Sequence, residues 1–248
     1  MQLWLCPLLA FLLGSIPFGL FIAKAKGIDI RNHGSGNIGA TNVFRIVGKK
    51  HGLTCLLLDA LKGFIPVAIA INLVRVAGSN PPWISLPFPE SWTLVQPQIA
   101  QFSVQLVHVL TALFAVLGHN YSPWIGFKGG KGIATSAGVV IALMPAAIVI
   151  LIIIFFATLL LTRYVAIASI VSATALPILT HLGARFHKNA AGISLWEAGT
   201  WNKPLFFFAL LIGLLAIWKH RTNIRRLRDG NESRFTWGGR KTPVALDP

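Results

Sequence analysis

Three polar segments of the chain combine glycines with side chains that can bind a phosphate group. The first, residues 34–45, reads GSGNIGATNVFR. Closely spaced glycines let several backbone N–H groups point at one anion, and an arginine can donate two hydrogen bonds to a phosphate. We therefore predict an anion-binding turn, with an ordinary polar loop as the alternative. Its candidate catalytic residues are Ser35 and Arg45, and its candidate substrate-binding residues are Gly34, Gly36, Asn37, Gly39, Thr41 and Asn42.

The same segment matches the G-x-G-x-x-G pattern of a dinucleotide-binding loop, and Asp59 follows its last glycine by 20 residues. That loop requires a preceding buried strand and a βαβ unit. Residues 30–33 (IRNH) do not form such a strand, and Asp59 lies inside an apolar run. Dinucleotide binding is therefore excluded.

The second segment, residues 118–132, reads GHNYSPWIGFKGGKG. It is not a Walker A loop, because Gly132 follows Lys131 where that loop needs Ser or Thr. An apolar run comes next, and a helix starting there would direct its free N–H groups and positive dipole end at the loop. The alternative is that the lysines only reach toward a membrane surface. The candidates are Lys131 for catalysis and Lys128, Gly129, Gly130 and Gly132 for substrate binding.

The third segment, residues 220–232, reads HRTNIRRLRDGNE. On a helix that continues the preceding span, His220, Asn223 and Leu227 share one face, while arginines occupy another. One face can look into a helix bundle while the other meets lipid headgroups. We take His220 and Asn223 as candidate catalytic residues; the alternative is a purely basic membrane anchor.

Long apolar runs separate these segments and must position them. The chain of 248 residues is 54% hydrophobic and only 12% charged, whereas soluble domains contain about 25% charged residues. A membrane span needs about 20 apolar residues. The first run is too long for a cleaved signal peptide, so we expect it to be retained. The predicted spans are residues 3–23, 53–76, 99–117, 132–144, 145–161, 164–182 and 205–218.

The fourth and fifth of these spans form one apolar stretch that is too long for a single helix across a membrane. Met144 and Pro145 stand near its middle, and proline interrupts the helical hydrogen bonds. We therefore expect two spans and an all-α, polytopic membrane protein with seven transmembrane helices. A single tilted helix, giving six spans, is the alternative.

The distribution of basic residues orients this bundle, because cytoplasmic loops are enriched in Lys and Arg. Residues 24–52 contain six basic residues, residues 78–98 contain none and residues 219–248 contain eight. Seven spans then place the N-terminus outside and the C-terminus inside. Residues 183–203, with three basic residues, would be an external exception. All three polar segments reach the cytoplasmic side in this topology.

Two ionisable residues, Asp59 and Lys62, lie within the second predicted span. Charges inside a membrane indicate function by default, but a pair at this spacing can also neutralise itself, so a supporting role and a chemical role both remain open. His108 and His181 are single histidines in apolar runs, for which packing is the simpler interpretation.

The net charge of +15 does not indicate nucleic-acid binding, because the basic residues flank spans and no basic soluble module is present. Anionic membrane lipid is the expected partner of these residues. The two cysteines, Cys6 and Cys55, offer neither a disulfide framework nor paired zinc ligands.

Taken together, the three segments resemble the three motifs of the bacterial acyl-phosphate:glycerol-3-phosphate acyltransferases, the PlsY family. The second match extends to Thr135, and the third includes Gly230 and Glu232. The runs GSIPFG from Gly14 and DALKG from Asp59 also fit. The resemblance covers about residues 1–232, with longer loops at 78–98 and 183–203 and an additional C-terminal tail.

This resemblance implies seven membrane helices and transfer of a fatty acyl group from acyl phosphate to glycerol 3-phosphate. The products would be 1-acyl-glycerol 3-phosphate (lysophosphatidic acid) and phosphate, in bacterial phospholipid biosynthesis. It also implies an active site facing the cytoplasm at the bacterial inner membrane, with no metal and no cofactor. We expect one transmembrane acyltransferase domain over residues 1–232, and a disordered polar cytoplasmic tail over residues 233–248.

As a mechanism, we expect the acyl phosphate head to bind among the first segment's amides, Ser35, Asn37 and Arg45. Glycerol 3-phosphate would bind Lys128 and Lys131, with His220 and Asn223 as further candidates. Its hydroxyl would attack the acyl carbonyl directly, because phosphate is already a good leaving group. Either the departing phosphate or His220 would take the proton.

A transporter or channel for an organic phosphate is the rival class. Transporters usually combine repeated halves with a site at the membrane midplane, and neither is visible in the sequence. The oligomeric state is left open.

Overall fold

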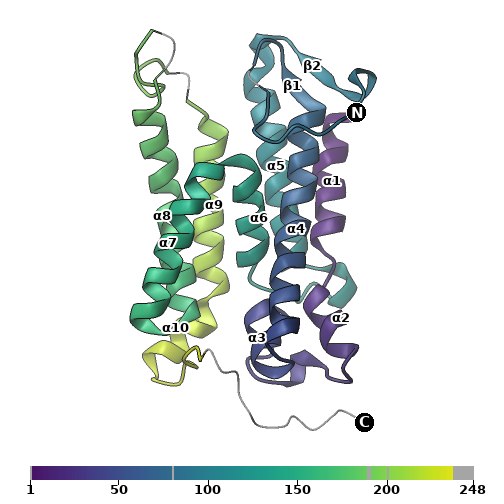
Figure 1. The fold of residues 1–248 in the computed structure, drawn as a ribbon, viewed down its shortest axis with the longest axis vertical. Helices are drawn as coiled ribbons and strands as arrows, with labels where there is room; N and C mark the ends of the chain where they lie inside the picture. The colour runs from purple at the N-terminus through teal and green to yellow at the C-terminus, as the bar shows by residue number, and fades with distance from the viewer. Residues whose placement is uncertain (1, 80, 189–190, 200, 237–248) are drawn as a thin grey trace.

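The computed structural model describes residues 2–79, 81–188, 191–199 and 201–236. They form a bundle of long helices in two groups (Figure 1). In one group α1 packs on α5 and α4 on α6; in the other α8 packs on both α7 and α9. The helices are α1 (Gln2–Gly14), α2 (Phe18–Lys24), α3 (Ala40–Ile46), α4 (Lys49–Leu73), α5 (Gln101–Asn120), α6 (Ile133–Leu143), α7 (Pro145–Thr162), α8 (Val165–Phe186), α9 (Lys203–Lys219) and α10 (Arg221–Arg228).

Many large apolar side chains face outward from this bundle, on α1, α4, α7, α8 and α9. An exposed apolar surface of that extent suits lipid rather than water. Among the described residues, five helical segments are long and apolar enough to cross a membrane, and the pair α9–α10 makes a sixth if it is counted as one span. The chain is therefore a multi-pass membrane protein. The five are Trp4–Lys24, Lys49–Leu73, Gln98–Ile125, Pro145–Thr162 and Val165–Phe186.

The first predicted span is one crossing made of two helices. Pro17 has no N–H to donate, so α1 ends at Gly14 and α2 begins at Phe18. The Ser15 hydroxyl donates to the Leu12 carbonyl at 2.7 Å, and the Ser122 hydroxyl donates to the Ser15 carbonyl at 2.6 Å. These bonds satisfy the interrupted backbone, which is the condition for a broken helix inside a membrane.

The predicted break at Met144 and Pro145 is confirmed. α6 ends at Leu143, α7 begins at Pro145, and the chain reverses direction between them (Figure 1). α6 has 11 residues, which correspond to about 16 Å of helix. It is thus shorter than a full span.

The end of the second predicted span, residues 53–76, is corrected. α4 stops at Leu73, and residues Val74–Val76 form a strand, β1, paired in parallel with β2 (Leu94–Gln96). The small ladder is also a local exception to the all-α class. Asn72 fixes this end of the bundle: its side-chain oxygen accepts from the Leu86 N–H at 3.0 Å, and its amide donates to the Ile84 carbonyl at 3.0 Å. Short 3-10 helices complete the loops, at Ile30–Asn32, Glu90–Trp92, Gln98–Ala100 and Pro123–Ile125.

The last span also differs from the prediction, because the helix does not continue straight into the third polar segment. α9 ends at Lys219 and α10 runs at 51° to it. Residues 233–235, which were expected to be disordered, contact α3 and the turn between α7 and α8; residues 237–248 of the expected tail lie outside the described residues. The Phe235 ring also packs against the Phe44 ring in a tilted arrangement, with ring centroids 5.5 Å apart.

Candidate active site

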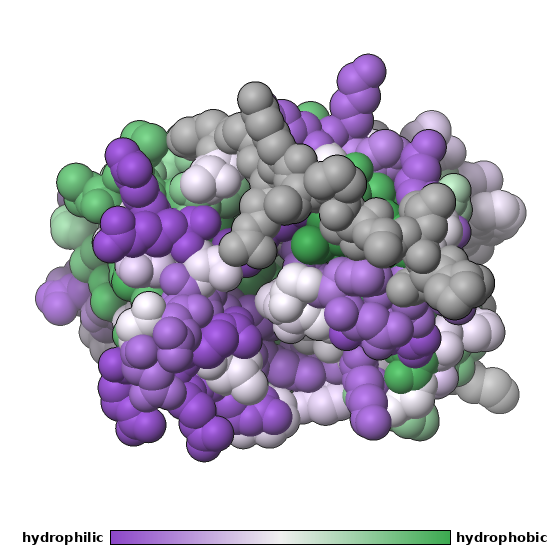
Figure 2. Space-filling view, turned by 90° about the horizontal axis from the view of Figure 1, so that it is seen from below, coloured by the Kyte–Doolittle hydropathy of each residue, from purple (hydrophilic) through white to green (hydrophobic). Residues whose placement is uncertain are grey.

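The three polar segments meet at the end of the bundle where α2, α3 and α10 lie (Figure 1). Seen from that end, hydrophilic residues gather in large groups on the surface (Figure 2). A cavity of about 150 Å³ opens among the segments. We call it the anion cavity. Its polar lining residues are Ser35, Asn37, Thr41, Asn42, Arg45, Asp59, His119, Lys131, Ser169, His220, Asn223 and Glu232.

Asn42 organises the first segment. Its buried side-chain amide donates to the carbonyls of Asn37 at 2.9 Å and His33 at 3.0 Å, and its oxygen accepts from the Ser35 N–H at 3.1 Å. One asparagine therefore closes the turn on itself from within. Although it lines the cavity, Asn42 fits a role in shaping the turn better than one in holding substrate.

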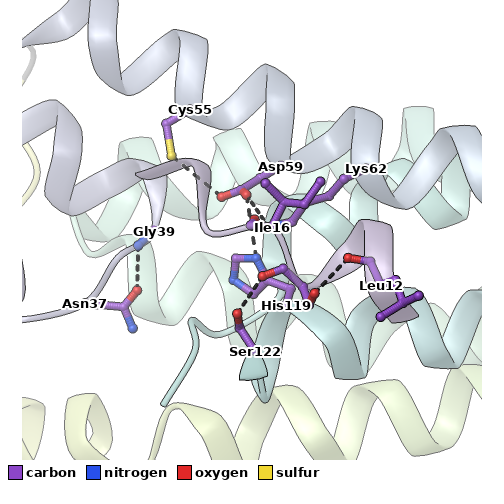
Figure 3. Close-up of polar contacts among 10 residues, drawn as sticks. Leu12, Ile16, Asn37, Gly39, Cys55, Asp59, Lys62, His119 and Ser122 are labelled. Carbon is purple, nitrogen blue, oxygen red and sulfur yellow. Dashed lines mark hydrogen bonds and ion pairs between the residues drawn. The ribbon is translucent and has the colours of Figure 1, made fainter. Parts of the chain in front are cut away.

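Two glycines of this turn adopt backbone angles that other residues rarely reach. Gly34 has φ +61° and Gly36 has φ +67°, the left-handed region that glycine enters without strain. Asn37 then accepts a bond from the Gly39 N–H at 2.8 Å (Figure 3). The result presents Ser35, Asn37 and Thr41 along one wall of the cavity.

The glycines of the second segment serve close packing. Gly130 donates its N–H to the His119 carbonyl at 3.1 Å, and a Cβ added to Gly130 would collide with the His119 ring. A Cβ on Gly129 would likewise strike the backbone of α5. Neither glycine lines the anion cavity, whereas Gly132 does.

The two lysines of this segment are placed differently. Lys131 reaches into the anion cavity and donates a hydrogen bond to the side-chain oxygen of Asn223. Lys128 is exposed and does not line the cavity. Only Lys131 is therefore in position to meet a ligand bound among the three segments.

The third segment supplies a connected polar group. The Asn223 amide donates to Glu232 Oε1 at 2.7 Å, and Arg226 Nε donates to Glu232 Oε2 at 2.7 Å. Glu232 has a side chain that is 7% exposed. It is the carboxylate that joins Asn223 and Arg226, and through Asn223 it fixes Lys131.

The charges around the cavity change the acidity of Lys131. Burial lowers its pKa to about 8, with contributions from the positive charges of Arg226 and Arg45, while Glu232 acts in the opposite direction. A substantial fraction of Lys131 can thus lose its proton within a physiological range of pH.

His220 lies just beyond the end of α9 and is neutral at pH 7. Burial and the nearby Lys131 charge lower its pKa to about 4. Its Nδ1 lies 2.8 Å from the Ala216 carbonyl, so in the neutral ring Nδ1 donates and Nε2 accepts. Such a ring can accept a hydrogen bond from a hydroxyl but is a weak base.

A buried cluster of polar side chains includes Asp59 and His119, which line the cavity, and Cys55 and Lys62 (Figure 3). Lys62 Nζ lies 2.7 Å from Asp59 Oδ1 and donates to the Ile16 carbonyl at 2.7 Å. His119 Nδ1 is 3.6 Å from the same Asp59 oxygen, and the Cys55 thiol donates to Asp59 Oδ2 at 3.6 Å. The expected Asp59–Lys62 pair is therefore formed, and Lys62 also holds the break between α1 and α2.

An apolar groove adjoins the anion cavity. It encloses about 430 Å³ between α4, α6, α7, α8 and α9, and its lining is almost entirely hydrocarbon. The anion cavity and the apolar groove share lining residues, so the polar space and the apolar space are adjacent. The shared residues are Leu56, Ile133, Ala134, Phe155 and Ser169.

Most residues proposed from the sequence therefore converge, and some do not. Gly34, Gly36, Gly129, Gly130, Lys62 and Lys128 lie outside the cavity lining. The sequence interpretation also gave no separate role to His119 or Glu232, although both stand inside the polar segments. Among the described residues, no group of three or more His, Cys, Asp or Glu could hold a metal ion.

Comparisons with known proteins agree with this arrangement. A family model described as glycerol-3-phosphate acyltransferase matches residues 4–230. The glycerol-3-phosphate acyltransferase of Aquifex aeolicus is 40% identical over 226 residues, covering 91% of this chain and 95% of that protein. The enzyme of the same description from Geotalea daltonii is 41% identical over 226 residues, covering 91% and 94%.

A solved structure is similar along the same length. The crystal structure of PlsY, an integral membrane glycerol 3-phosphate acyltransferase, in its glycerol 3-phosphate form, matches with a TM-score of 0.72 and 37% identity. The match covers 95% of this chain and 96% of that one. Its lysophosphatidic acid form matches with a TM-score of 0.70. The chain therefore belongs to the PlsY family of glycerol-3-phosphate acyltransferases.

Proposed function

We propose that this acyltransferase takes its fatty acyl group from acyl phosphate and transfers it to glycerol 3-phosphate. The observation that carries the proposal is the junction between the anion cavity and the apolar groove. A donor with a compact phosphate head and a long hydrocarbon tail fits both spaces at once. Each methylene group buried in the groove contributes about 0.8 kcal/mol to binding.

Arg45 and Lys131 bind the two phosphate groups in this scheme, Arg45 that of the donor and Lys131 that of the acceptor. Placing the acceptor hydroxyl next to the acyl carbonyl accounts for much of the catalysis, since the leaving group is already activated. The hydroxyl oxygen forms a bond to the carbonyl carbon, and the bond from that carbon to the phosphate oxygen breaks. Phosphate leaves with the electron pair.

The proton of the hydroxyl goes to the departing phosphate. His220 has a pKa of about 4, which makes it a poor base at neutral pH. Its Nε2 instead accepts a hydrogen bond from the hydroxyl and orients it. Asn223, held by Glu232, keeps Lys131 directed at the acceptor phosphate.

The proposed topology has seven crossings, with the N-terminus outside and the C-terminus inside the bacterial inner membrane. Successive long helices alternate in direction, and the start of α1 and the position of α10 lie at opposite ends (Figure 1). α6, with the loop before it, makes the short fourth crossing, buried against α4 and α5. The basic loops then face the cytoplasm, and so does the anion cavity.

The donor assignment is tested with purified protein, glycerol 3-phosphate and either palmitoyl phosphate or palmitoyl-CoA. We expect lysophosphatidic acid and stoichiometric phosphate from palmitoyl phosphate alone. A thioester is less activated and would need a stronger general base than His220. Comparable turnover with palmitoyl-CoA would overturn the assignment.

The residue roles are tested by a matched pair of lysines in one segment. Lys131→Met should lower kcat/KM at least about 100-fold, as expected for losing a buried charge contact to a phosphate. Lys128→Met should stay within about twofold of the unmodified chain, because surface substitutions have small effects. Equal losses in both variants would show that the substrate lies elsewhere.

A further inference from the structure

The chain turns sharply after α10 and then runs beside the anion cavity. Gly230, at φ +70°, makes the turn, and the Asn231 N–H donates to the Arg226 carbonyl at 2.7 Å. Glu232 then lines the cavity. Residues 233–235, which follow it, continue along that end of the bundle, and we call them the strap.

The strap is attached to α3 at two points. Arg45 Nη2 donates to the Ser233 carbonyl at 3.1 Å, and the Phe235 ring lies 5.5 Å from the Phe44 ring. Phe44 and Arg45 are neighbours on a helix of only seven residues. The strap therefore contacts the side chain of Arg45 and the side chain of its neighbour in α3.

The strap is also attached to the other helix group, at the turn between α7 and α8. The Phe235 N–H donates to the Arg163 carbonyl at 2.6 Å, and Arg234 Nε donates to the Tyr164 hydroxyl at 3.3 Å. These contacts bridge the two groups of helices that flank the apolar groove.

We infer that the strap is a positioning element, which orients Arg45 toward the phosphate of the acyl donor by holding its guanidinium and its helix. The inference rests on the proposed function of the anion cavity. A guanidinium has five N–H donors in a fixed plane, so a bond from one nitrogen to a fixed carbonyl sets the direction of the others. Arg45 is only half-buried, and its bond to the Ser233 carbonyl restricts the rotamers that its long side chain can adopt.

The alternative, a strap that blocks the cavity, predicts the opposite change in donor affinity when the strap is loosened. A blocking strap would weaken donor binding, so loosening it would improve affinity. A positioning strap improves donor binding, so loosening it must raise KM for the donor. The acceptor, which meets Lys131, should be affected much less in either case.

The experiment uses full-length variants of Phe235, whose ring fixes the strap on α3. Phe235→Ala should raise KM for palmitoyl phosphate about three- to tenfold, the range expected for losing one aromatic pair. KM for glycerol 3-phosphate and the unfolding temperature should stay nearly unchanged. Phe235→Tyr keeps the ring and should restore the donor KM.

A binding measurement shows whether the effect passes through Arg45. Hexadecyl phosphate, an unreactive molecule with the same head and tail, is titrated into the unmodified chain, Phe235→Ala, Arg45→Ala and the double variant. We expect Phe235→Ala to weaken binding about three- to tenfold when Arg45 is present and not when it is replaced. An equal loss in both backgrounds, no loss at all, or tighter binding would overturn the inference.

This measurement separates the inference from the proposed function. Failure of the unmodified chain to use palmitoyl phosphate would refute the donor assignment alone, since the binding cycle involves no turnover. Normal turnover with a strap variant that binds as well as the unmodified chain would refute the positioning role alone.

Discussion

Raising the pH from 7 to 9 should lower the kcat/KM of the enzyme through Lys131. Burial and two arginines lower the pKa of Lys131 to about 8 from an ordinary value of 10.5. Loss of its proton removes the positive charge that, in the proposed mechanism, binds the acceptor phosphate. The pH dependence of kcat/KM reports groups of the free enzyme, so it should show this ionisation.

The size of the effect follows from that pKa. With a pKa of about 8, the protonated fraction falls from about 0.9 at pH 7 to about 0.1 at pH 9. We therefore expect kcat/KM for glycerol 3-phosphate to fall about tenfold over this range, whereas a lysine of ordinary pKa would lose only about 3% of its charge. The free energy of unfolding should move the other way, rising with pH between about 8 and 10.5, because the unfolded state binds more protons there.

The assay is initial phosphate release from palmitoyl phosphate at limiting glycerol 3-phosphate, in buffers of constant ionic strength. Glu232→Gln is the informative companion, since the Glu232 carboxylate raises the pKa of Lys131. In that variant the decline should begin at lower pH. A profile that stays flat from pH 7 to 9, or the same midpoint in both proteins, would refute the assignment of Lys131.

Three further predictions concern separate parts of the protein. Arg45→Lys should lower kcat/KM by about 10- to 100-fold despite keeping the charge, because an ammonium cannot make the planar two-bond contact; a near-normal rate would reduce Arg45 to a surface anchor. Cysteines placed at Ser79 and Lys49 should react with a membrane-impermeant thiol reagent from opposite sides, Ser79 from outside, and labelling of both from one side would overturn the topology. Ala173→Phe should fill part of the apolar groove and shift donor preference toward shorter acyl chains in a competition assay, while Val171→Phe, outside the groove lining, should not.

The features predicted correctly from the sequence depend on local rules. Pro145 begins α7, a position that suits proline because its ring fixes φ and it has no N–H to donate. Pro66 and Pro177 lie inside unbroken helices, so the break was predicted from the proline together with the excess length of the apolar stretch. The meeting of the three polar segments was predicted from the expected number of crossings between them and from their basic residues, and the structure brings the three segments together. Neither prediction depends on a contact between two particular side chains.

The features that were missed depend on contacts across the fold. His119 lies near Asp59 because of the height and rotation of α5 beside α4. Spacing in the sequence relates residues within one helix only, so it could not predict this contact. Glu232 reaches Asn223 through the chain reversal at Gly230. A usable signal was present for Glu232, since it is a single glutamate beside a run of arginines on a segment already assigned to the site.

Glycines near the polar motifs meet two different structural requirements, which cannot be distinguished in the sequence. Gly34 and Gly36 are needed for their backbone angles. Gly63 and Gly118 are needed because another backbone lies against them: an added Cβ would strike the Thr135 carbonyl or the Phe11 carbonyl. Small residues that allow such close approach are the usual means of packing helices in membranes.

The packing glycines set the position of the buried cluster. Gly118 holds α5 against α1, and His119 is the next residue along the chain, so the height of its ring follows from that contact. Gly63 holds α4 against α6, one residue beyond Lys62, which holds the broken end of α1 through the Ile16 carbonyl. A slight separation at Gly118 would therefore withdraw His119 from Asp59 without changing either residue. The glycines around this site are therefore needed for the positions of the helices as much as for phosphate binding.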